Sequence, residues 1–310
     1  MPKILVTGAS GFVGKSLTAE LFRQDYDIGA AARSTKSQIN NAEVVVVGEI
    51  DGNTDWTNAL RNVDVVIHLA ARVHVMKENF ANPLAEFRKV NVEGTQQLAQ
   101  SAANAGVKRF VYISSIGVNG FKTTLPFTES VNPNPHSDYA ISKWEAEQVL
   151  LRVSAETGLE VVIIRPPLVY GFDAPGNFAS MMRVVKRGIP LPFGAIHNKR
   201  SFVYVGNLVS FILLCIDHPA AANQTFLISD GHDISTTELL RGCAEVLGMK
   251  ARLLPFPQKL VEVCATIIGK RDVAQRLCGN LQVDISKART LLGWAPPKSV
   301  ADGLKATALG

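Results

Sequence analysis

Tyr139 and Lys143 bracket the segment Tyr-Ala-Ile-Ser-Lys, which sets a phenol and an ammonium four residues apart. On a helix, residues at positions i and i+4 share one face, so these two side chains converge on one small volume. A nearby ammonium stabilises a phenolate, and we therefore expect the tyrosine pKa to fall below its usual value of about 10. A hydroxyl such as that of Ser115 would hydrogen-bond a substrate oxygen while the tyrosine exchanges its proton. The three residues predict acid–base chemistry that interconverts an alcohol and a ketone.

The N-terminal segment predicts a dinucleotide site. An apolar run over 4–6 indicates a buried strand, which leads into three glycines and then into apolar residues at helical spacing. The first glycine permits a tight turn, the second lets backbone approach a pyrophosphate, and the third lets the helix pack close to the strand. The helix start offers N–H groups and the positive end of its dipole to the phosphates. The residues expected to contact the cofactor here are Gly8, Ser10, Gly11, Phe12, Val13 and Gly14.

The end of the second strand bears on which dinucleotide is bound. An enzyme that uses NAD usually has an acid there, which grips the ribose 2′-hydroxyl. This chain has Ala32 at that position and Arg33 directly after it. A guanidinium pairs well with a 2′-phosphate, so the sequence favours NADP, with NAD held by other contacts as the alternative.

Strand-like and helical stretches alternate along the first half of the chain. Runs rich in β-branched residues at 44–47, 63–69, 110–115 and 161–165 alternate with helical spacing over 84–105 and 137–157. Such continuous runs suit strands covered on both faces, which predicts an α/β fold with a doubly wound parallel Rossmann sheet. Past Gly171 the alternation loosens, and we expect a smaller, mostly helical substrate-binding lobe. The predicted division assigns 1–170 and 201–232 to the Rossmann domain, and 171–200 and 233–310 to the lobe.

Composition narrows the class of protein. With 310 residues and 47% hydrophobic residues, the chain can bury one sizeable core plus a lobe. No apolar run approaches a membrane span, the chain begins directly with a strand, and its net charge of +5 comes from basic residues without dense runs. We therefore expect a cytoplasmic protein with neither a membrane nor a nucleic-acid partner and no metal. Four scattered cysteines are expected to be reduced core thiols: Cys215, Cys243, Cys264 and Cys278.

Taken together, these separated motifs resemble the extended short-chain dehydrogenase/reductase family, and within it the NAD(P)-dependent epimerase/dehydratase branch that acts on nucleotide sugars such as UDP-glucose. The resemblance runs nearly end to end. Ser115, Tyr139 and Lys143 match the family's catalytic residues, and the three glycines match its nucleotide-binding turn. It implies further cofactor contacts from Glu49, Ile50, Leu69, Ala70, Ala71, Asn91 and Pro166, with Tyr139 and Lys143 also holding the cofactor.

The resemblance also implies where a nucleotide sugar would bind. Asn177 falls where the family often contacts phosphates, and Arg200 opens a segment whose arginine grips a pyrophosphate. Arg276 is a further candidate contact. The family's dehydratases place Thr and an acidic pair near the catalytic hydroxyl, but this chain reads Ser115-Ile116-Gly117, so dehydration is not expected. A homodimer through the helices after the fourth and fifth strands is expected by the same resemblance.

The favoured hypothesis is an enzyme that exchanges hydride with carbon 4 of a UDP-linked hexose. Because the acid after the second strand is missing and Arg33 is present, the sequence favours a reductase that uses NADPH. The resemblance implies that such a reductase would be a 4-keto reductase of a UDP-N-acetyl-deoxyhexose. A UDP-hexose 4-epimerase with bound NAD is the first alternative. The others are a reductase of a hydrophobic ketone and a dinucleotide-sensing protein without catalysis.

Overall fold

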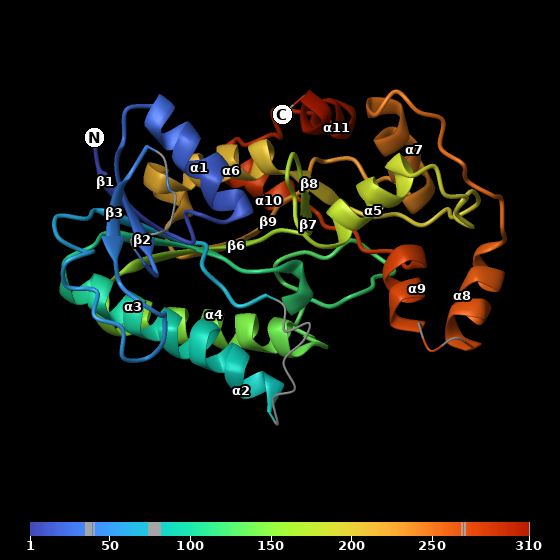
Figure 1. The fold of residues 1–310 in the computed structure, drawn as a ribbon. Coiled ribbons are helices and arrows are strands. Elements are labelled where there is room, and N and C mark those ends of the chain that lie inside the picture. The colour runs from blue at the N-terminus through green and yellow to red at the C-terminus, as the bar shows by residue number, and fades with distance from the viewer. Residues whose placement is uncertain (35–38, 40, 74–81, 268, 270, 310) are drawn as a thin grey trace.

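The computed structural model of the protein describes residues 1–34, 39, 41–73, 82–267, 269 and 271–309. Its central element is a seven-stranded sheet in which every neighbouring pair runs parallel (Figure 1). In spatial order the strands are β3 (Glu43–Val46), β2 (Asp27–Ala32), β1 (Lys3–Thr7), β4 (Val65–His68), β5 (Arg109–Ile113), β6 (Glu160–Arg165) and β9 (Gln224–Leu227). The strand order reverses direction at β1, so the predicted doubly wound parallel sheet is confirmed.

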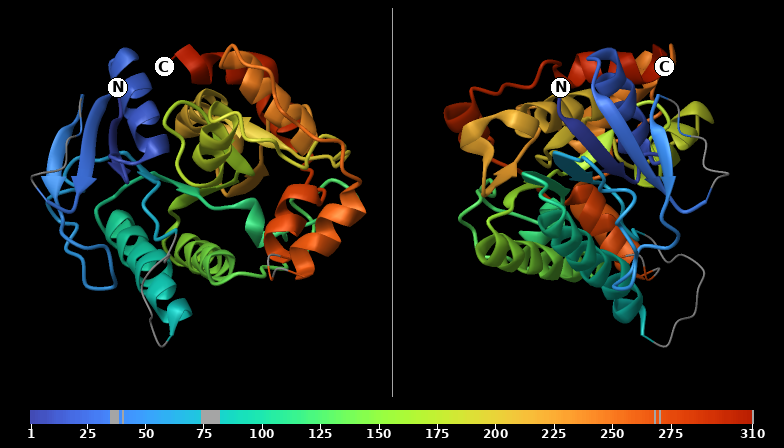
Figure 2. Two further views of the ribbon diagram at one scale, coloured as in Figure 1. Left: turned by 45° about the vertical axis from the view of Figure 1, so that its right-hand side comes forward. Right: turned by 90° about the vertical axis from the view of Figure 1, so that its left-hand side faces the viewer.

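Helices cover both faces of this sheet, and alternate strand residues face opposite layers (Figure 2). Ile4 and Val6 belong to one buried cluster, while Leu5 between them belongs to the other. The first layer is α1 (Phe12–Arg23), α6 (Val205–Asp217) and α10 (Ser286–Leu292), and the second is α3 (Gly94–Asn104) and α4 (Asp138–Thr157). Ahead of α3 lie α2 (Pro83–Arg88) and the π-helical turn η1 (Lys89–Glu93).

The edge strand β3 departs from the expectation that every strand is covered on both faces. It pairs with β2 alone, and its Val44 and Val46 side chains are 37% and 48% exposed. A run of β-branched residues fits any extended backbone, so it indicated the strand correctly but not its coverage.

The second half of the chain builds the helical lobe at the right of Figure 1. Its core joins Tyr170 and Phe178 to Phe202, Leu240 and Leu304. The elements are β7 (Leu168–Tyr170), β8 (Phe202–Tyr204), α5 (Asn177–Lys186), α7 (Thr236–Val246), α8 (Gln258–Ile267), α9 (Arg271–Cys278) and α11 (Val300–Leu309). Two short 3-10 turns complete the fold, η2 (Ile116–Val118) and η3 (Pro219–Ala221).

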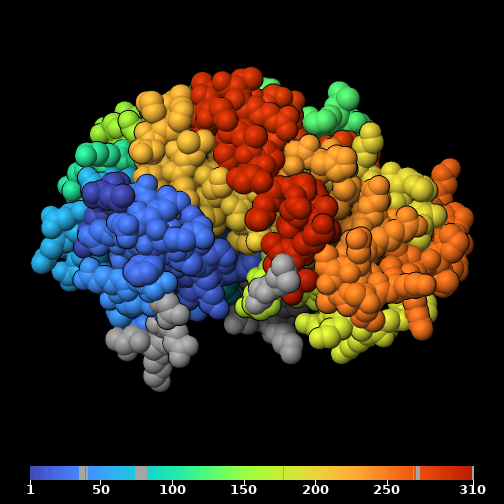
Figure 3. All heavy atoms as spheres, turned by 90° about the horizontal axis from the view of Figure 1, so that it is seen from above, coloured from blue at the N-terminus to red at the C-terminus, as the bar shows by residue number. Residues whose placement is uncertain are grey.

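The C-terminal segment ties the lobe to the sheet. Seen from above, it runs between the N-terminal part and the lobe (Figure 3). The Tyr170 hydroxyl donates to an Asp230 carboxylate oxygen at 2.8 Å and lies 3.2 Å from the Val300 carbonyl oxygen, while the Asn207 amide donates to Asp230 at 2.7 Å. This buried network holds α6, β7 and α11 together. The predicted domain boundaries and the predicted homodimer stay predictions.

Among the described residues, no helix has the length and hydropathy that crossing a membrane requires. The same residues contain no group of three or more His, Cys, Asp or Glu side chains arranged to hold a metal ion. Cys215, Cys243 and Cys278 are buried free thiols, as expected. The expectation was wrong for Cys264, which is exposed because α8 lies at the surface of the lobe.

Candidate active site

The glycine turn after β1 has the backbone conformation that the sequence predicts. Gly8 has a φ of +69°, and its carbonyl accepts a 2.9 Å hydrogen bond from the Gly11 N–H. A side chain at position 8 would place its Cβ only 2.8 Å from the Ala70 backbone nitrogen. The turn therefore lies directly against the segment that follows β4. This segment contains Leu69, Ala70 and Ala71, which the family resemblance implies as cofactor contacts.

The helix start beyond this turn fits a dinucleotide pyrophosphate. α1 begins at Phe12, and its cap residue is Gly11, so no side chain caps its first amides. A Cβ at Gly14 would lie 2.2 Å from the Gly8 carbonyl oxygen, which means that helix and strand touch there. The exposed backbone amides at a helix N-terminus and the absence of side chains leave a cradle for phosphates. The backbone at Gly8, Gly11 and Gly14 therefore fits the pyrophosphate of a nicotinamide dinucleotide.

Gly14→Ala tests this close approach. The added methyl group has no space against the Gly8 carbonyl, so the helix must shift, and we expect at least about a hundredfold weaker dinucleotide binding with about 1–3 kcal/mol of lost stability. Titration of nicotinamide dinucleotide and urea unfolding would measure the two effects. Gly29→Ala is the matched control, because a Cβ there meets the Leu5 side chain at an ordinary 3.5 Å. Unchanged binding by Gly14→Ala would contradict this interpretation of the turn.

Arg33 and Glu49 lie together at the exposed ends of β2 and β3. Their side chains form a 3.7 Å ion pair, and each is 75% exposed. The charge of Arg33 is thus partly balanced by Glu49, and its predicted contact with the cofactor stays a prediction. Ile50 packs beside α3, where a Cβ at Gly94 would come within 2.7 Å of it.

Asn91 sits in the π-helical turn η1, an irregularity that is frequent at functional sites. Its side chain is buried, accepts from the Arg72 N–H at 2.8 Å, and donates to the Arg72 carbonyl and the Ser142 hydroxyl at 3.1 and 2.9 Å. These bonds fasten the segment after β4 to α4. The structure gives Asn91 a positioning role, and its predicted contact with the cofactor stays a prediction.

Helix α4 carries the predicted acid–base pair. Its N-cap is Ser137, whose hydroxyl accepts from the Ala140 N–H at 3.2 Å, and Tyr139 lies in the first turn. Lys143 follows one turn later on the same face and is only 1% exposed. Its Nζ lies 4.0 Å from the centre of the Tyr112 ring, a cation–π contact.

The expected lowering of the Tyr139 pKa is wrong for this structure. Burial raises the pKa of Tyr139 to about 12, and burial lowers the pKa of Lys143 to about 7 despite the attraction of Glu147. The reason is that both side chains lose water, which disfavours the phenolate and the ammonium alike. The spacing identified the pair but not the balance between charge attraction and desolvation.

His68 lies behind Lys143 and is a packed, hydrogen-bonded histidine. Its Nδ1 is 2.6 Å from the Thr7 Oγ1, and its Nε2 is 3.0 Å from the Thr95 Oγ1. Burial and the nearby Lys143 lower the pKa of His68 to about 3, so the ring is neutral. It therefore offers hydrogen bonds rather than charge.

Glu147 and Arg165 form a buried ion pair that sequence reasoning missed. The Arg165 guanidinium donates to both Glu147 carboxylate oxygens at 2.9 and 2.5 Å, and to the Asn119 side-chain oxygen at 2.9 Å. The Ser114 hydroxyl also donates to Glu147 at 2.5 Å. The network fixes α4 against β6 and against the loop that carries Ser115. The sequence did contain one indication of Glu147: it follows Lys143 by four residues, which places it on the same face of the same helix.

Glu147→Gln tests whether this network holds the site. The substitution leaves the buried guanidinium of Arg165 without a charge partner, so we expect a loss of about 3 kcal/mol in unfolding free energy. Glu145→Gln, on the same helix, is the control, since its 2.5 Å pair with Arg88 is exposed at 30% and 45% and is expected to contribute less than about 1 kcal/mol. Equal stability of both variants in urea would contradict the assignment.

Ser115 and Tyr139 line one cleft of about 800 Å³ together with Arg200 and Arg276. The volume suits a small-molecule ligand. Ser115 is the N-cap of η2, and its hydroxyl oxygen accepts from the Gly117 N–H at 3.1 Å, which orients it. Pro166 holds the adjoining loop by accepting from the Ile116 N–H at 3.0 Å. Four predicted residues, from the loop after β5, from α4 and from the lobe, thus line the same cleft.

The cleft also has members that the motifs did not identify. Phe121 and His136 line it, with ring centres 4.7 Å apart in an edge-to-face contact. Neither residue lies in a motif, and both belong to loops whose path follows from tertiary contacts. Burial lowers the pKa of Arg200 to about 10, so its guanidinium stays charged at neutral pH and donates to the Gly279 carbonyl at 2.9 Å. Asn177 begins α5, but its side chain lies outside the described residues.

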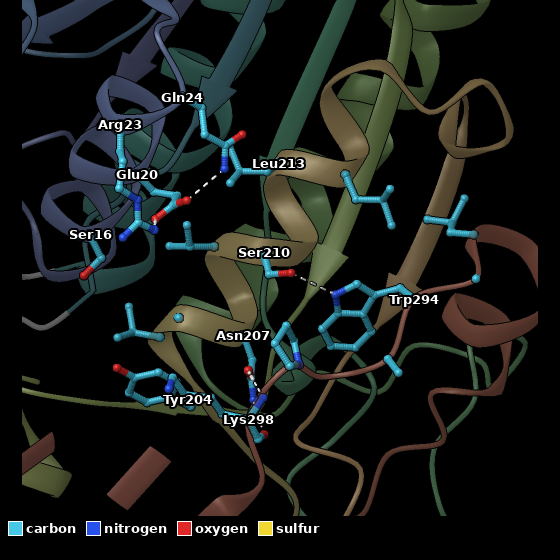
Figure 4. Close-up of a pocket in the computed structure, with 18 of the residues that line it drawn as sticks. Ser16, Glu20, Arg23, Gln24, Tyr204, Asn207, Ser210, Leu213, Trp294 and Lys298 are labelled. Carbon is cyan, nitrogen blue, oxygen red and sulfur yellow. Dashed lines mark hydrogen bonds and ion pairs between the residues drawn. The ribbon is translucent and has the colours of Figure 1, made fainter. Parts of the chain in front are cut away.

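A second hollow, of about 910 Å³, lies elsewhere, between α1, α6 and the C-terminal segment (Figure 4). Its polar side chains pair with their neighbours: Glu20 with Gln24, Asn207 with the Lys298 backbone, and Trp294 with Ser210. It contains none of the predicted catalytic residues. We interpret it as a packing groove between α1, α6 and the C-terminal segment.

The chain is similar to known sugar epimerases. The chain is 48% identical over 313 residues to a UDP-glucose 4-epimerase of Vibrio cholerae, with 99% of this chain and 95% of the relative covered. It is 28% identical over 320 residues to an N-acetyl-α-D-glucosaminyl-diphospho-ditrans,octacis-undecaprenol 4-epimerase of Escherichia coli O157:H7, with 98% and 93% covered. Among solved structures, a UDP-glucuronic acid 4-epimerase from Bacillus cereus in complex with NAD superposes with a TM-score of 0.80, at 23% identity and with 99% and 95% covered.

A family model covers most of the sheet and the cleft. Residues 4–229 match the NAD dependent epimerase/dehydratase family, a stretch that includes the glycine turn, Ser115, Tyr139 and Lys143. The chain is therefore an enzyme of the NAD dependent epimerase/dehydratase family.

Proposed function

We propose that the protein is a 4-epimerase of a UDP-linked hexose that holds a nicotinamide dinucleotide throughout turnover. One observation carries the proposal: the hydroxyl groups of Ser115 and Tyr139 share a cleft with the cations Arg200 and Arg276. A phenol and a hydroxyl suit an alcohol–ketone exchange, and two guanidinium groups suit a diphosphate. The names of both curated relatives describe 4-epimerases whose sugar is attached through a diphosphate.

The residues divide the chemistry in a simple way. The bound dinucleotide supplies hydride exchange at the sugar carbon. In its ionised form Tyr139 takes the proton of the sugar hydroxyl as the ketone forms, and it returns that proton as the alcohol is restored, while Ser115 holds the sugar oxygen. Because burial raises the pKa of Tyr139 to about 12, the phenol must first lose its own proton to solvent before the alcohol is oxidised. Lys143 is buried next to the Tyr112 ring, which in turn stacks on His68, and it supports Tyr139 from the interior of the protein. Arg200 and Arg276 hold the diphosphate, which leaves the sugar free to present either face.

A second candidate is the 4-keto reductase that the sequence alone favoured. Arg33 after Ala32 supports it, because an arginine without a neighbouring acid on β2 suits NADPH as an exchangeable reductant. Two observations weigh toward the epimerase: Glu49 already pairs with Arg33, and the Bacillus cereus structure contains NAD. We therefore propose NAD as the bound cofactor and NADP as the alternative.

Purified protein can distinguish the two candidates. An epimerase is expected to release a nicotinamide dinucleotide when it is denatured. It is also expected to convert UDP-hexoses into their 4-epimers with no cofactor added, as followed by mass spectrometry and NMR. A reductase is expected to consume NADPH only when a 4-keto sugar nucleotide is supplied. Failure to convert any UDP-hexose without added cofactor, together with NADPH consumption on a keto sugar, would overturn the epimerase proposal.

Arg200→Ala tests the diphosphate contact. Because a charge-assisted bond to phosphate is lost, we expect KM for the nucleotide sugar to rise about 10- to 100-fold with a smaller change in kcat. Arg187→Ala, an exposed arginine at the end of α5, is the control and should leave both constants unchanged. An unchanged KM in Arg200→Ala would instead favour a hydrophobic ketone as substrate.

A further inference from the structure

Helix α8 is an apolar helix without a partner on its outer side. None of its ten residues is buried, and the sequence Gln-Lys-Leu-Val-Glu-Val-Cys-Ala-Thr-Ile is mostly apolar. Leu260, Val263 and Ile267 follow one another at helical spacing and are 45%, 54% and 78% exposed. Amphipathic helices normally turn such a stripe toward a core. Here the stripe faces outward, which marks a surface that contacts something else.

The apolar surface extends beyond the helix. Leu254 and Phe256, just before α8, are 46% and 41% exposed, and Val273 on α9 is 52% exposed. Between α8 and α9 lies a groove of about 330 Å³ lined by apolar side chains and the Cys264 thiol. We call the surface formed by Leu254, Phe256, Leu260, Val263, Ile267 and Val273 the hairpin patch.

The charges around the hairpin patch indicate what covers it. Residues 250–276 contain six basic and two acidic residues, a local net charge of +4 within a chain whose net charge is +5. Lys270 and Arg271 are adjacent, but the other four cations stand apart, so the segment contains no long basic run. Lys250, Arg252 and Lys259 are exposed. A second copy of this surface would bring like charges together, whereas an anionic lipid surface complements both the cations and the apolar stripe.

The position of the hairpin suits contact with a flat surface. α8 and α9 project from the end of the lobe, away from the sheet and its helices (Figures 1 and 2). α9 also reaches the cleft, because Gln275 and Arg276 line it while Ala274 and Leu277 line the apolar groove. A surface that meets the hairpin patch therefore lies close to the cleft that contains Tyr139.

We propose that the hairpin patch docks the enzyme on an anionic phospholipid membrane. The contact is peripheral: α8 lies in the headgroup region with Leu260, Val263 and Ile267 toward the acyl chains, and the flanking lysines and arginines contact anionic headgroups. This revises the expectation from sequence that the protein has no membrane partner. The proposal concerns binding alone and holds whether the enzyme is an epimerase or a reductase.

Vesicle co-sedimentation of the purified full chain tests the proposal. We expect binding to phosphatidylcholine vesicles with about one-third phosphatidylglycerol, and at least about fivefold less binding to phosphatidylcholine alone. Raising the salt from about 0.1 M to about 0.5 M should release much of the protein. Leu260→Glu/Val263→Glu should lower the bound fraction at least about fivefold, and Arg252→Glu/Lys259→Glu should lower it on the anionic vesicles.

Leu291→Glu is the matched control, since Leu291 is 41% exposed and belongs to α10, which packs on the sheet rather than in the lobe. It should bind as the unsubstituted protein does, and circular dichroism should show all variants folded. Protein that stays in the supernatant with both vesicle types would overturn the proposal. So would a Leu260→Glu/Val263→Glu variant that binds fully. The proposal would also be overturned if the unsubstituted protein sedimented without vesicles and Leu260→Glu/Val263→Glu did not. A second copy of the chain would then cover the patch.

Discussion

Tyr139→Phe should lower turnover of a UDP-hexose about 1,000-fold while leaving the fold intact. The substitution removes the Tyr139 hydroxyl, which lines the cleft together with Ser115, and general acid–base catalysis typically contributes a factor of about 10² to 10⁴. Single-turnover assays would measure the loss. Because the aromatic ring and its edge-to-face contact with Phe87 remain, we expect unchanged stability and nearly unchanged substrate affinity.

Tyr26→Phe is the control for this change, since Tyr26 lies at the turn into β2, on the opposite side of the sheet from α4. Its kcat should stay within about twofold of the unsubstituted protein, which corresponds to less than about 0.5 kcal/mol. Full activity of Tyr139→Phe would overturn the assignment of this phenol. It would also revive the alternative of a dinucleotide-sensing protein without catalysis.

The elements that the sequence predicted well are those governed by local rules. The glycine turn follows from the conformations and contacts that Gly8 and Gly14 alone permit, so three spaced glycines between a strand and a helix were sufficient. The parallel sheet follows from buried strands alternating with helices. Tyr139 and Lys143 follow from spacing on one helix, and the match to the family extended this to Ser115.

What the sequence missed depends on contacts between distant segments. The pair of Glu147 and Arg165 joins a helix to a strand, and each residue alone resembles an ordinary surface charge. The pKa values of Tyr139 and Lys143 depend on how much water the fold removes, which spacing does not encode. The apolar stripe of α8 has the pattern of a core helix, so only the structure reveals that none of the ten α8 residues is buried.

Lys143→Met should stabilise the fold near neutral pH and abolish turnover. Lys143 is 1% exposed, and burial lowers its pKa from 10.5 to about 7, which means that the folded state disfavours the ammonium. One pKa unit corresponds to about 1.4 kcal/mol, so a neutral side chain of similar length should raise the unfolding free energy by about 2–4 kcal/mol. Turnover should be lost because the side chain one helical turn after Tyr139 can then no longer carry a positive charge.

The pH dependence of this gain has a definite sign. Between about pH 7 and pH 10.5 the unfolded chain binds a proton at Lys143 that the folded chain does not, so the unsubstituted protein gains stability as pH rises. Lys143→Met lacks this gain, and its advantage in urea unfolding should therefore be largest at about pH 6.5 and shrink toward about pH 9.5. Lys89→Met, at a lysine 56% exposed, should show no such trend. A Lys143→Met variant that is less stable than the unsubstituted protein at the lower pH would contradict this prediction. It would mean that Glu147 and the Tyr112 ring fully compensate the cost of burying the ammonium and keep Lys143 charged.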